Sequence, residues 1–288
     1  LGNTNKISEY SYACKKLGIK ILPPDINYGE GAFSVDHGNI RYGLTAIKSL
    51  GRPVIEAIIR ERNLNGPYRD FKDLVERLSS KEINKRTVEN LIKSGALDCF
   101  HVTRKQQMIV YASVIDSIQK ERKNEIAGQM SLMDLLGEED QQSFQISYPD
   151  VGEYEKEQKL AMEKEVLGIY VSGHPLEDDI ERLERSVTAH TSDFVIDEET
   201  GKTKIHDRES CIIGGLISEM SVKLTKKNQN MAFITLEDLR GTVEVVVFPR
   251  QYATYQSLLR EDAKVFIKGT TQISEEESKV ICNQIISF

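Results

Sequence analysis

The spacing of apolar residues divides the chain into a helical part and a strand-rich part. Between Leu44 and Arg62 the apolar positions recur every three or four residues, which places them on one face of a helix. From Ser210 onward the apolar residues are mostly β-branched or aromatic and fall in five short runs, which is typical of strands. The pattern therefore predicts a multidomain chain, with a mostly α-helical region followed by an all-β domain.

Two tight turns are expected within the helical region. The first is Ser49-Leu50-Gly51-Arg52-Pro53, because Gly51 can adopt a positive φ and Pro53 suits the first turn of a new helix. The second is Ser94-Gly95, after which a helix resumes near Arg104. The pattern is that of paired helical hairpins. Helices are expected from residue 44 up to the first turn and at 53–62, 71–78, 81–93, 106–123 and 155–170.

Net charge changes sign along the chain, which alters what the total implies. The whole chain carries 38 basic and 45 acidic side chains, and its net charge of −7 by itself argues against a nucleic-acid partner. Residues 40–105, however, contain 14 basic and 8 acidic side chains, whereas residues 106–209 contain 11 and 24. The hairpins therefore lie in a basic block, and the local charge decides whether a surface attracts phosphates.

The two turns carry the groups that a duplex-binding surface needs. The N–H groups and the dipole at the start of each following helix favour an anion, and basic residues flank both turns. This combination suits DNA phosphates, in binding that ignores base sequence and weakens with salt. The alternative is that Gly51 and Gly95 are simple helix caps beside a solvated basic face. The candidate duplex-binding residues are Lys48, Ser49, Leu50, Gly51, Arg52, Lys93, Gly95, Arg104 and Lys105.

The last segment has the order of elements of an OB-fold barrel. A short helix is expected at 251–259, between the third and fourth strands. OB folds bind single strands on aromatic platforms with basic residues nearby, and Lys223, Lys226, Lys227 and Phe233 are the candidates here. The alternative is a core role for Phe233, with lysines that only keep the sheet edge soluble. The strands are expected at 211–220, 230–236, 242–248, 263–271 and 279–286.

A short apolar cluster lies inside the acidic block. Gln129-Met130-Ser131-Leu132-Met133 and the apolar residues after it are followed by a polar, acidic run at 137–142. Such a cluster has no local surface to bury against, which is typical of a peptide that docks into a partner's pocket. The alternative is a loop that folds back onto its own domain.

No set of catalytic or metal-binding residues stands out in the sequence. There is no Asp-x-Asp pair on an expected strand, no Gly-rich phosphate loop and no nucleophile–His pair. The four cysteines are widely spaced, and His174 lies alone in an expected turn. No apolar run approaches the ~18 residues of a membrane span. We therefore expect a cytoplasmic chain with reduced thiols and, because it starts at Leu1 rather than Met, a piece of a longer protein.

Several separate runs resemble one protein family. Residues 40–51 are similar to the first hairpin of the tandem helix-hairpin-helix region of bacterial DNA polymerase III alpha subunits of the DnaE type, apart from Ser49, where the family usually has Gly. Residues 84–98 resemble the second hairpin, 18–27 the end of the fingers region, and 163–176 a recognisable run of the C-terminal third. The resemblance covers essentially the whole chain, as the C-terminal region of such a polymerase.

The resemblance implies a role in chromosome replication. The parent protein would be a DNA-directed DNA polymerase that uses Mg²⁺, with its palm carboxylates outside this chain, so this chain is expected to hold no cofactor and to be inactive alone. Gln129 would be the polar anchor of an internal peptide for the sliding clamp (beta subunit), with Leu132 and Met133 in the clamp's pocket. The other implied partners are duplex DNA, single-stranded DNA, the rest of the polymerase chain and the replisome, with no membrane.

The expected domains follow from the same resemblance. They are the end of the fingers region at 1–39, a tandem helix-hairpin-helix domain at 40–120, a clamp-binding segment with a helical and irregular connection at 121–209, and an OB-fold domain at 210–288. Two alternatives fit parts of the pattern. A free-standing repair or recombination protein would use hairpins and a barrel without a clamp peptide. An RNA-binding enzyme fragment would use the barrel, but the duplex-binding hairpins argue against it.

Overall fold

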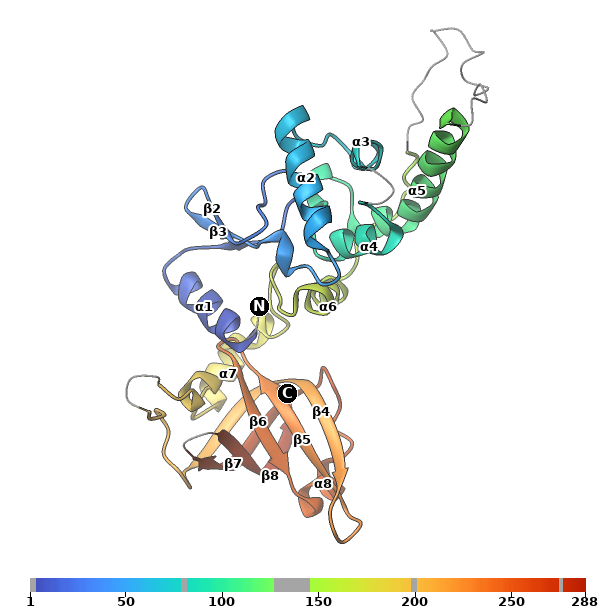
Figure 1. The fold of residues 1–288 in the computed structure, drawn as a ribbon. Coiled ribbons are helices and arrows are strands. Elements are labelled where there is room, and N and C mark those ends of the chain that lie inside the picture. Colours follow the sequence, from blue (N-terminus) through green and yellow to red (C-terminus); the bar gives the residue numbers. More distant parts are fainter. Residues whose placement is uncertain (1–3, 79–81, 127–145, 198–200, 275–276) are drawn as a thin grey trace. The chain divides into compact units, whose positions relative to one another are not determined.

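The chain forms two compact units in the computed structural model, which describes residues 4–78, 82–126, 146–197, 201–274 and 277–288 (Figure 1). The helical unit contains residues 18–172, and the barrel unit contains residues 4–17 and 173–288. In these described ranges, no helix is both long enough and apolar enough to cross a membrane. The fold class expected from the sequence, helical hairpins followed by a β-barrel, is confirmed.

The helical unit combines five helices with a small sheet, within the residues described. The three strands pair in the order β1-β3-β2, with β1 parallel and β2 antiparallel to β3. Two short 3-10 turns, η1 (Leu44–Ala46) and η2 (Asp98–Phe100), precede α2 and α5. The elements are β1 (Ile21–Leu22), β2 (Ser34–Asp36), β3 (Asn39–Arg41), α2 (Arg52–Asn65), α3 (Phe71–Arg77), α4 (Lys85–Lys93), α5 (Arg104–Ile126) and α6 (Lys156–Leu167).

Side-chain caps determine where the middle helices begin. The carboxylate of Asp70 accepts from the N–H of Asp73 at the start of α3, and the amide oxygen of Asn84 accepts from the N–H of Thr87 at the start of α4. The expected helix at 71–78 is thus confirmed, whereas the helix expected from residue 81 begins at Lys85, directly after its cap. The expected helices at 53–62, 106–123 and 155–170 correspond to α2, α5 and α6.

The first expected helix is wrong, because residues 44–46 form a single 3-10 turn, η1. The N–H of Lys48 does not continue a helix from Leu44; it donates instead to the carbonyl of Val166 in α6, at 2.8 Å. The positive φ of this turn also lies elsewhere than expected, since Ser49 has φ +62° and Gly51 has φ −71°. Contacts with a distant helix have overridden the local periodicity at this turn.

The barrel unit is built on a closed five-stranded barrel with the strand order β4-β5-β6-β8-β7. Pairing is antiparallel except between β6 and β8, and the short helix α8 (Pro249–Tyr255) connects β6 to β7. At Gly215 a side chain would collide with the carbonyl oxygen of Glu237, so β4 can approach β5 closely there. The strands are β4 (Ser210–Leu224), β5 (Asn230–Glu237), β6 (Thr242–Val247), β7 (Lys264–Ile273) and β8 (Ser278–Ser287).

Alternate residues of the strands point into the barrel and form its core. Ala232, Ile234 and Leu236 of β5 are at most 1% exposed and belong to this core, as do Val243 and Val245 of β6. All four cysteines are free, and the two in the barrel, Cys211 and Cys282, are buried. Outside the barrel the unit contains α1 (Thr4–Lys16), η4 (Glu177–Asp179), α7 (Ile180–Ser186) and η5 (Thr191–Phe194).

Candidate nucleic-acid interface

The first turn presents unpaired backbone donors at the start of a long helix. Gly51 is the N-cap of α2, and no side chain caps this helix end. Within the described ranges, the N–H groups of Ser49, Gly51 and Arg52 have no hydrogen-bond acceptor. Pro53, the second residue of the helix, has no N–H to satisfy. The turn therefore offers three donors and the positive end of a 14-residue helix to an anion.

Three exposed basic side chains surround these donors. Lys48 and Arg52 lie in the turn itself and are exposed, as the sequence led us to expect. Arg86 of α4 joins them, because its guanidinium donates to the hydroxyl of Ser49 at 3.3 Å. Sequence reasoning missed Arg86, which is 37 residues from Ser49, although the basic pair Lys85-Arg86 was a signal for it. None of the three cations forms an ion pair with a carboxylate of the described chain. We call Lys48, Ser49, Gly51, Arg52 and Arg86 the open turn.

The side chain of Leu50 has a different role. It is 7% exposed and packs in the core of the helical unit. This packing attaches the open turn to the core. Leu50 therefore serves the turn through packing, and only its neighbours on either side reach the surface.

The second turn is built in the opposite way, because its groups are used within the chain. Gly95 is buried and has φ +80°, and a side chain there would collide with the guanidinium of Arg104. Arg104 is 1% exposed; it donates to the carboxylate of Asp98 and to the carbonyl of Lys93, and its Nη1 lies 3.0 Å from Oε1 of Glu163. Gly95 and Arg104 are therefore structural residues here, placed in the core instead of on a surface for DNA.

The helix that follows the second turn already has an anion at its start. The carboxylate of Glu153 accepts from the N–H groups of Arg104 and Lys105, at 3.2 and 3.3 Å. Burial alone would raise the pKa of Glu153, but these N–H groups and that of Tyr154 hold this pKa below its usual range. The start of α5 is therefore occupied by the chain's own carboxylate.

The remaining basic residues near the second turn are also engaged or partly covered. Lys93 forms ion pairs with Glu89 and Glu165, at 2.9 and 3.0 Å, and its side chain is 15% exposed. Lys105 is half-buried, with its ammonium 5.9 Å from the centre of the Tyr154 ring. The two turns, which look alike in the sequence, thus differ in whether an anion from outside can reach them.

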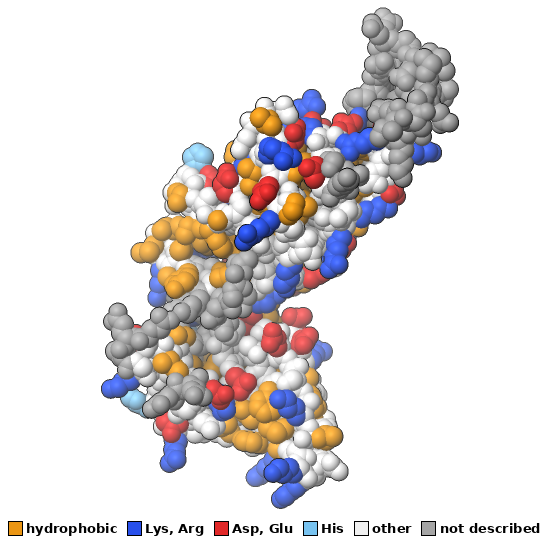
Figure 2. Space-filling model, in the orientation of Figure 1, with side chains coloured by type: hydrophobic (Ala, Val, Ile, Leu, Met, Phe, Trp, Pro, Cys, Tyr) orange, Lys and Arg blue, Asp and Glu red, His pale blue; other side chains and the backbone are white. Residues whose placement is uncertain are grey.

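On the barrel, the candidate single-strand residues lie together at the β4–β5 end. Phe233 lies between Ala232 and Ile234, which point into the core, so its ring is on the outer face of β5. The ammonium of Lys223 is 4.7 Å from the centre of this ring, and Lys226 and Lys227 are exposed in the turn between the strands. Figure 2 shows exposed hydrophobic side chains next to basic ones on this unit. The core role for Phe233 is therefore wrong.

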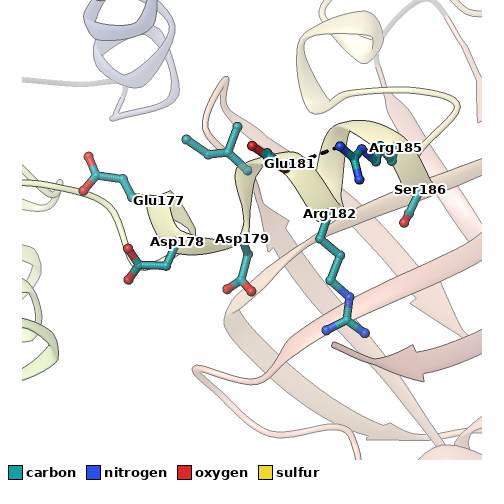
Figure 3. A pocket seen from close by; sticks show the side chains of 8 residues that line it. Glu177, Asp178, Asp179, Glu181, Arg182, Arg185 and Ser186 are labelled. Carbon is teal, nitrogen blue, oxygen red and sulfur yellow. Dashed lines mark hydrogen bonds and ion pairs between the residues drawn. The ribbon is translucent and has the colours of Figure 1, made fainter.

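A separate recess on the barrel unit has mixed charge. Asp179 forms an ion pair with Lys264 at 2.7 Å. Figure 3 shows the ion pair between Glu181 and Arg185, at 3.5 Å. Acidic and basic groups along this recess thus neutralise each other in part, and nothing in it has the arrangement of a catalytic centre. Its lining residues are Glu177, Asp178, Asp179, Ile180, Glu181, Arg182, Arg185 and Ser186.

The sequence also raised the questions of a metal site and of a clamp-binding peptide. Among the described residues, no group of three or more His, Cys, Asp and Glu side chains could hold a metal ion. The candidate clamp peptide, Gln129 to Met133, lies outside the described residues.

Two family models match the two units. A helix-hairpin-helix motif matches residues 18–107, which include both turns, and an OB-fold nucleic acid binding domain matches residues 212–287, which form the barrel. Among solved structures, the Saccharomyces cerevisiae mitochondrial single-stranded DNA binding protein Rim1 covers 29% of this chain at 14% identity with a TM-score of 0.25, which is too low to bear on function.

Curated relatives match almost the whole chain. The chain is 32% identical to the DNA polymerase III subunit alpha of Mycobacterium leprae, 34% identical to that of Bacillus subtilis and 34% identical to that of Escherichia coli K12. These matches cover 98%, 99% and 96% of this chain, but only 23%, 24% and 23% of the relatives. The chain thus spans about a quarter of the length of the relatives it matches, and it belongs to the family of bacterial DNA polymerase III alpha subunits.

Proposed function

We propose that this chain binds the backbone of duplex DNA through the open turn, as part of a replicative DNA polymerase. The observation that carries the proposal lies at the start of α2, where three N–H donors without an acceptor coincide with three exposed cations that form no ion pair within the described part of the chain. Phosphate oxygens accept hydrogen bonds and are attracted by both the cations and the helix dipole. Contacts of this kind position a protein on a duplex without reading its sequence.

The open turn is the main duplex contact in this proposal. The second turn contributes little, because Glu153 occupies the start of α5 and Arg104 is buried. Lys93 and Lys105 add positive charge near the surface without offering free backbone donors. The acidic composition of the whole chain is compatible with this role, since the cations of the open turn form no ion pair with a carboxylate of the described residues.

The barrel is proposed to contact single-stranded template. Its support is the outward-facing Phe233 beside Lys223, with Lys226 and Lys227 on the adjoining turn. An exposed ring stacks with a base of any identity, while lysines attract the backbone. The family model that matches the barrel is described as a nucleic acid binding domain, which agrees with this role.

Clamp docking and DNA synthesis complete the proposal at the level of the parent protein. The names of the relatives indicate a polymerase subunit, and the residues that would carry catalysis are expected outside this chain. Gln129 to Met133 are proposed as the peptide that inserts into the sliding clamp, with Gln129 and Leu132 as its main anchors.

Duplex binding is tested by fluorescence anisotropy with a labelled 20-base-pair duplex at several salt concentrations. The charge reversals Lys48→Glu and Arg52→Glu should each weaken binding. Each should also reduce the slope of log K against log salt by the amount expected for the loss of about one to two phosphate contacts. Lys120→Glu is the matched control, because Lys120 is an exposed cation of the same unit, on α5. Binding that does not respond to salt, or that falls equally in all three variants, would show that the open turn is not the duplex contact.

Clamp binding is tested separately with purified sliding clamp. Replacing Gln129 and Leu132 by Ala should remove clamp binding and leave the duplex affinity unchanged, because the changes lie outside the open turn. Equal clamp affinity of the variant and the unaltered chain would rule out this peptide as the docking segment.

A further inference from the structure

The backbone of Lys48 is held at both its N–H and its carbonyl group by residues far away in the sequence. Its N–H donates to the carbonyl of Val166 in α6 at 2.8 Å. Its carbonyl accepts from the side-chain amide of Asn90 in α4 at 2.7 Å. Both distances are those of good hydrogen bonds, so the peptide group before Lys48 and the peptide group after it are each held by a distant helix.

The next residue has the one unfavourable backbone conformation of the open turn. Ser49 has φ +62°, in the left-handed region that glycine adopts readily and that is unfavourable for a residue with a side chain. Such a conformation persists where the surrounding structure imposes it. The bond from Asn90 is positioned to do this, because the Lys48 carbonyl that it holds and the Ser49 nitrogen belong to the same peptide group. The bond to Val166 holds the preceding peptide group.

Each partner group is available for this task. Val166 is the second-last residue of α6, where carbonyl groups have no partner within the helix, so its oxygen is free to accept from Lys48. Asn90 lies in the last turn of α4 with a half-buried side chain, whose amide donates to the Lys48 carbonyl. The side chain of Asn90 is uncharged, so it contributes no electrostatic attraction or repulsion to a DNA phosphate.

We propose that Asn90 is a positioning residue for phosphate binding, acting through the backbone of Ser49. By fixing the Lys48 carbonyl it keeps Ser49 left-handed, and this conformation turns the N–H groups of Gly51 and Arg52 and the two flanking cations toward one side. The inference rests on the duplex-binding function proposed for the open turn. It adds that α4 and α6 help to position the open turn for phosphate binding, although neither helix is adjacent to the turn in the sequence.

The role is tested with a cycle of variants at Asn90 and Ser49. Asn90→Ala should weaken duplex binding about three- to tenfold, because Ser49 is then no longer held in its unfavourable left-handed conformation. The slope of log K against log salt should not change, because no cation has been removed. Ser49→Gly should bind like the unaltered chain, because glycine adopts φ +62° without help. The double variant should then bind within about twofold of the unaltered chain, because in glycine the conformation no longer depends on Asn90.

Two further variants guard against a loss of structure. Asn90→Leu is similar in size to asparagine but has no donor, so it should behave like Asn90→Ala. Asn63→Ala is the matched control, because Asn63 is an exposed amide near the opposite end of α2 from the open turn. Thermal unfolding by circular dichroism identifies any variant that has lost its fold; rescue by Ser49→Gly in a folded variant is the readout that a purely structural role would not produce.

The outcomes separate this inference from the proposed function. If the unaltered chain does not bind a duplex in a salt-dependent manner, both fail. If it does, but Asn90→Ala binds equally well, only the positioning role fails. A reduced salt slope in Asn90→Ala, or weak binding that Ser49→Gly does not restore, would also overturn positioning, since the first indicates a direct phosphate contact and the second a general loss of structure.

Discussion

The guanidinium of Arg104 and the carboxylate of Glu163 form an ion pair inside the helical unit, with Nη1 of the arginine 3.0 Å from Oε1 of the glutamate. The arginine side chain is 1% exposed and the glutamate side chain is fully buried. The other oxygen of Glu163 accepts from the N–H groups of Val171 and Ser172. One carboxylate thus connects the start of α5 to the last residues of the unit, and no polar group of this network is left unpaired.

Removing Glu163 should destabilise the helical unit strongly. Glu163→Ala leaves a buried guanidinium with one carboxylate fewer and two part-buried N–H groups without their acceptor, so we expect a loss of about 3 kcal/mol in the free energy of unfolding. Glu121→Ala, at an exposed position of α5, is the control and should cost less than about 0.5 kcal/mol. Urea unfolding followed by circular dichroism measures both, and similar midpoints would contradict the role given to the buried pair.

Gly95 should tolerate no side chain. Its φ of +80° disfavours any other residue, and a β-carbon would collide with the guanidinium of Arg104, so Gly95→Ala should cost about 2 kcal/mol or more. Gly152→Ala is the matched change, because a β-carbon there meets no atom within 4 Å. Unfolding midpoints of the two variants test the prediction; a Gly95→Ala protein as stable as Gly152→Ala would show that the turn can rearrange.

The stability of the start of α5 should depend on pH through Glu153. Because its folded-state pKa lies below the usual 4.5, the carboxylate stabilises the unit fully above that value, and this contribution disappears as the pH falls through the lowered pKa. Glu153→Gln should therefore be less stable than the unaltered chain at pH 7, and the difference should shrink below pH 4.5. Thermal unfolding at a series of pH values measures this difference; a gap that grows on acidification would contradict it.

Single-strand binding should depend on the ring of Phe233 more than on its bulk. Phe233→Leu keeps an apolar side chain on the outer face of β5 but removes the stacking platform, so we expect a loss of about 1 kcal/mol or more in binding free energy to oligo-dT. Lys268→Ala, at an exposed position of β7, removes a charge of the same unit outside the candidate surface. Anisotropy titrations with both variants decide the matter, and a larger effect of Lys268→Ala would place the contact elsewhere on the barrel.

Local pattern was sufficient for most of the elements. The five strands of the barrel agree with the runs of β-branched residues to within a few residues at each end, and α3, α5 and α6 agree with the helical periodicity. These elements follow from side-chain spacing and turn residues, which act over short stretches of chain. The helix expected at Leu44 failed for the opposite reason, since the N–H of Lys48 donates to the carbonyl of the distant Val166 instead of continuing a helix.

The sequence by itself determined the fold class and the places of the two turns, because alternation and periodicity are properties of neighbouring residues. Only the tertiary structure decided which turn is open to an anion. Glu153 reaches the start of α5 from 49 residues away, Glu163 reaches Arg104 from 59, and Arg86 reaches Ser49 from 37. Electrostatic and hydrogen-bond partners act through space, so two turns with similar local sequences acquire different chemistry once the distant carboxylates and cations have been brought to them.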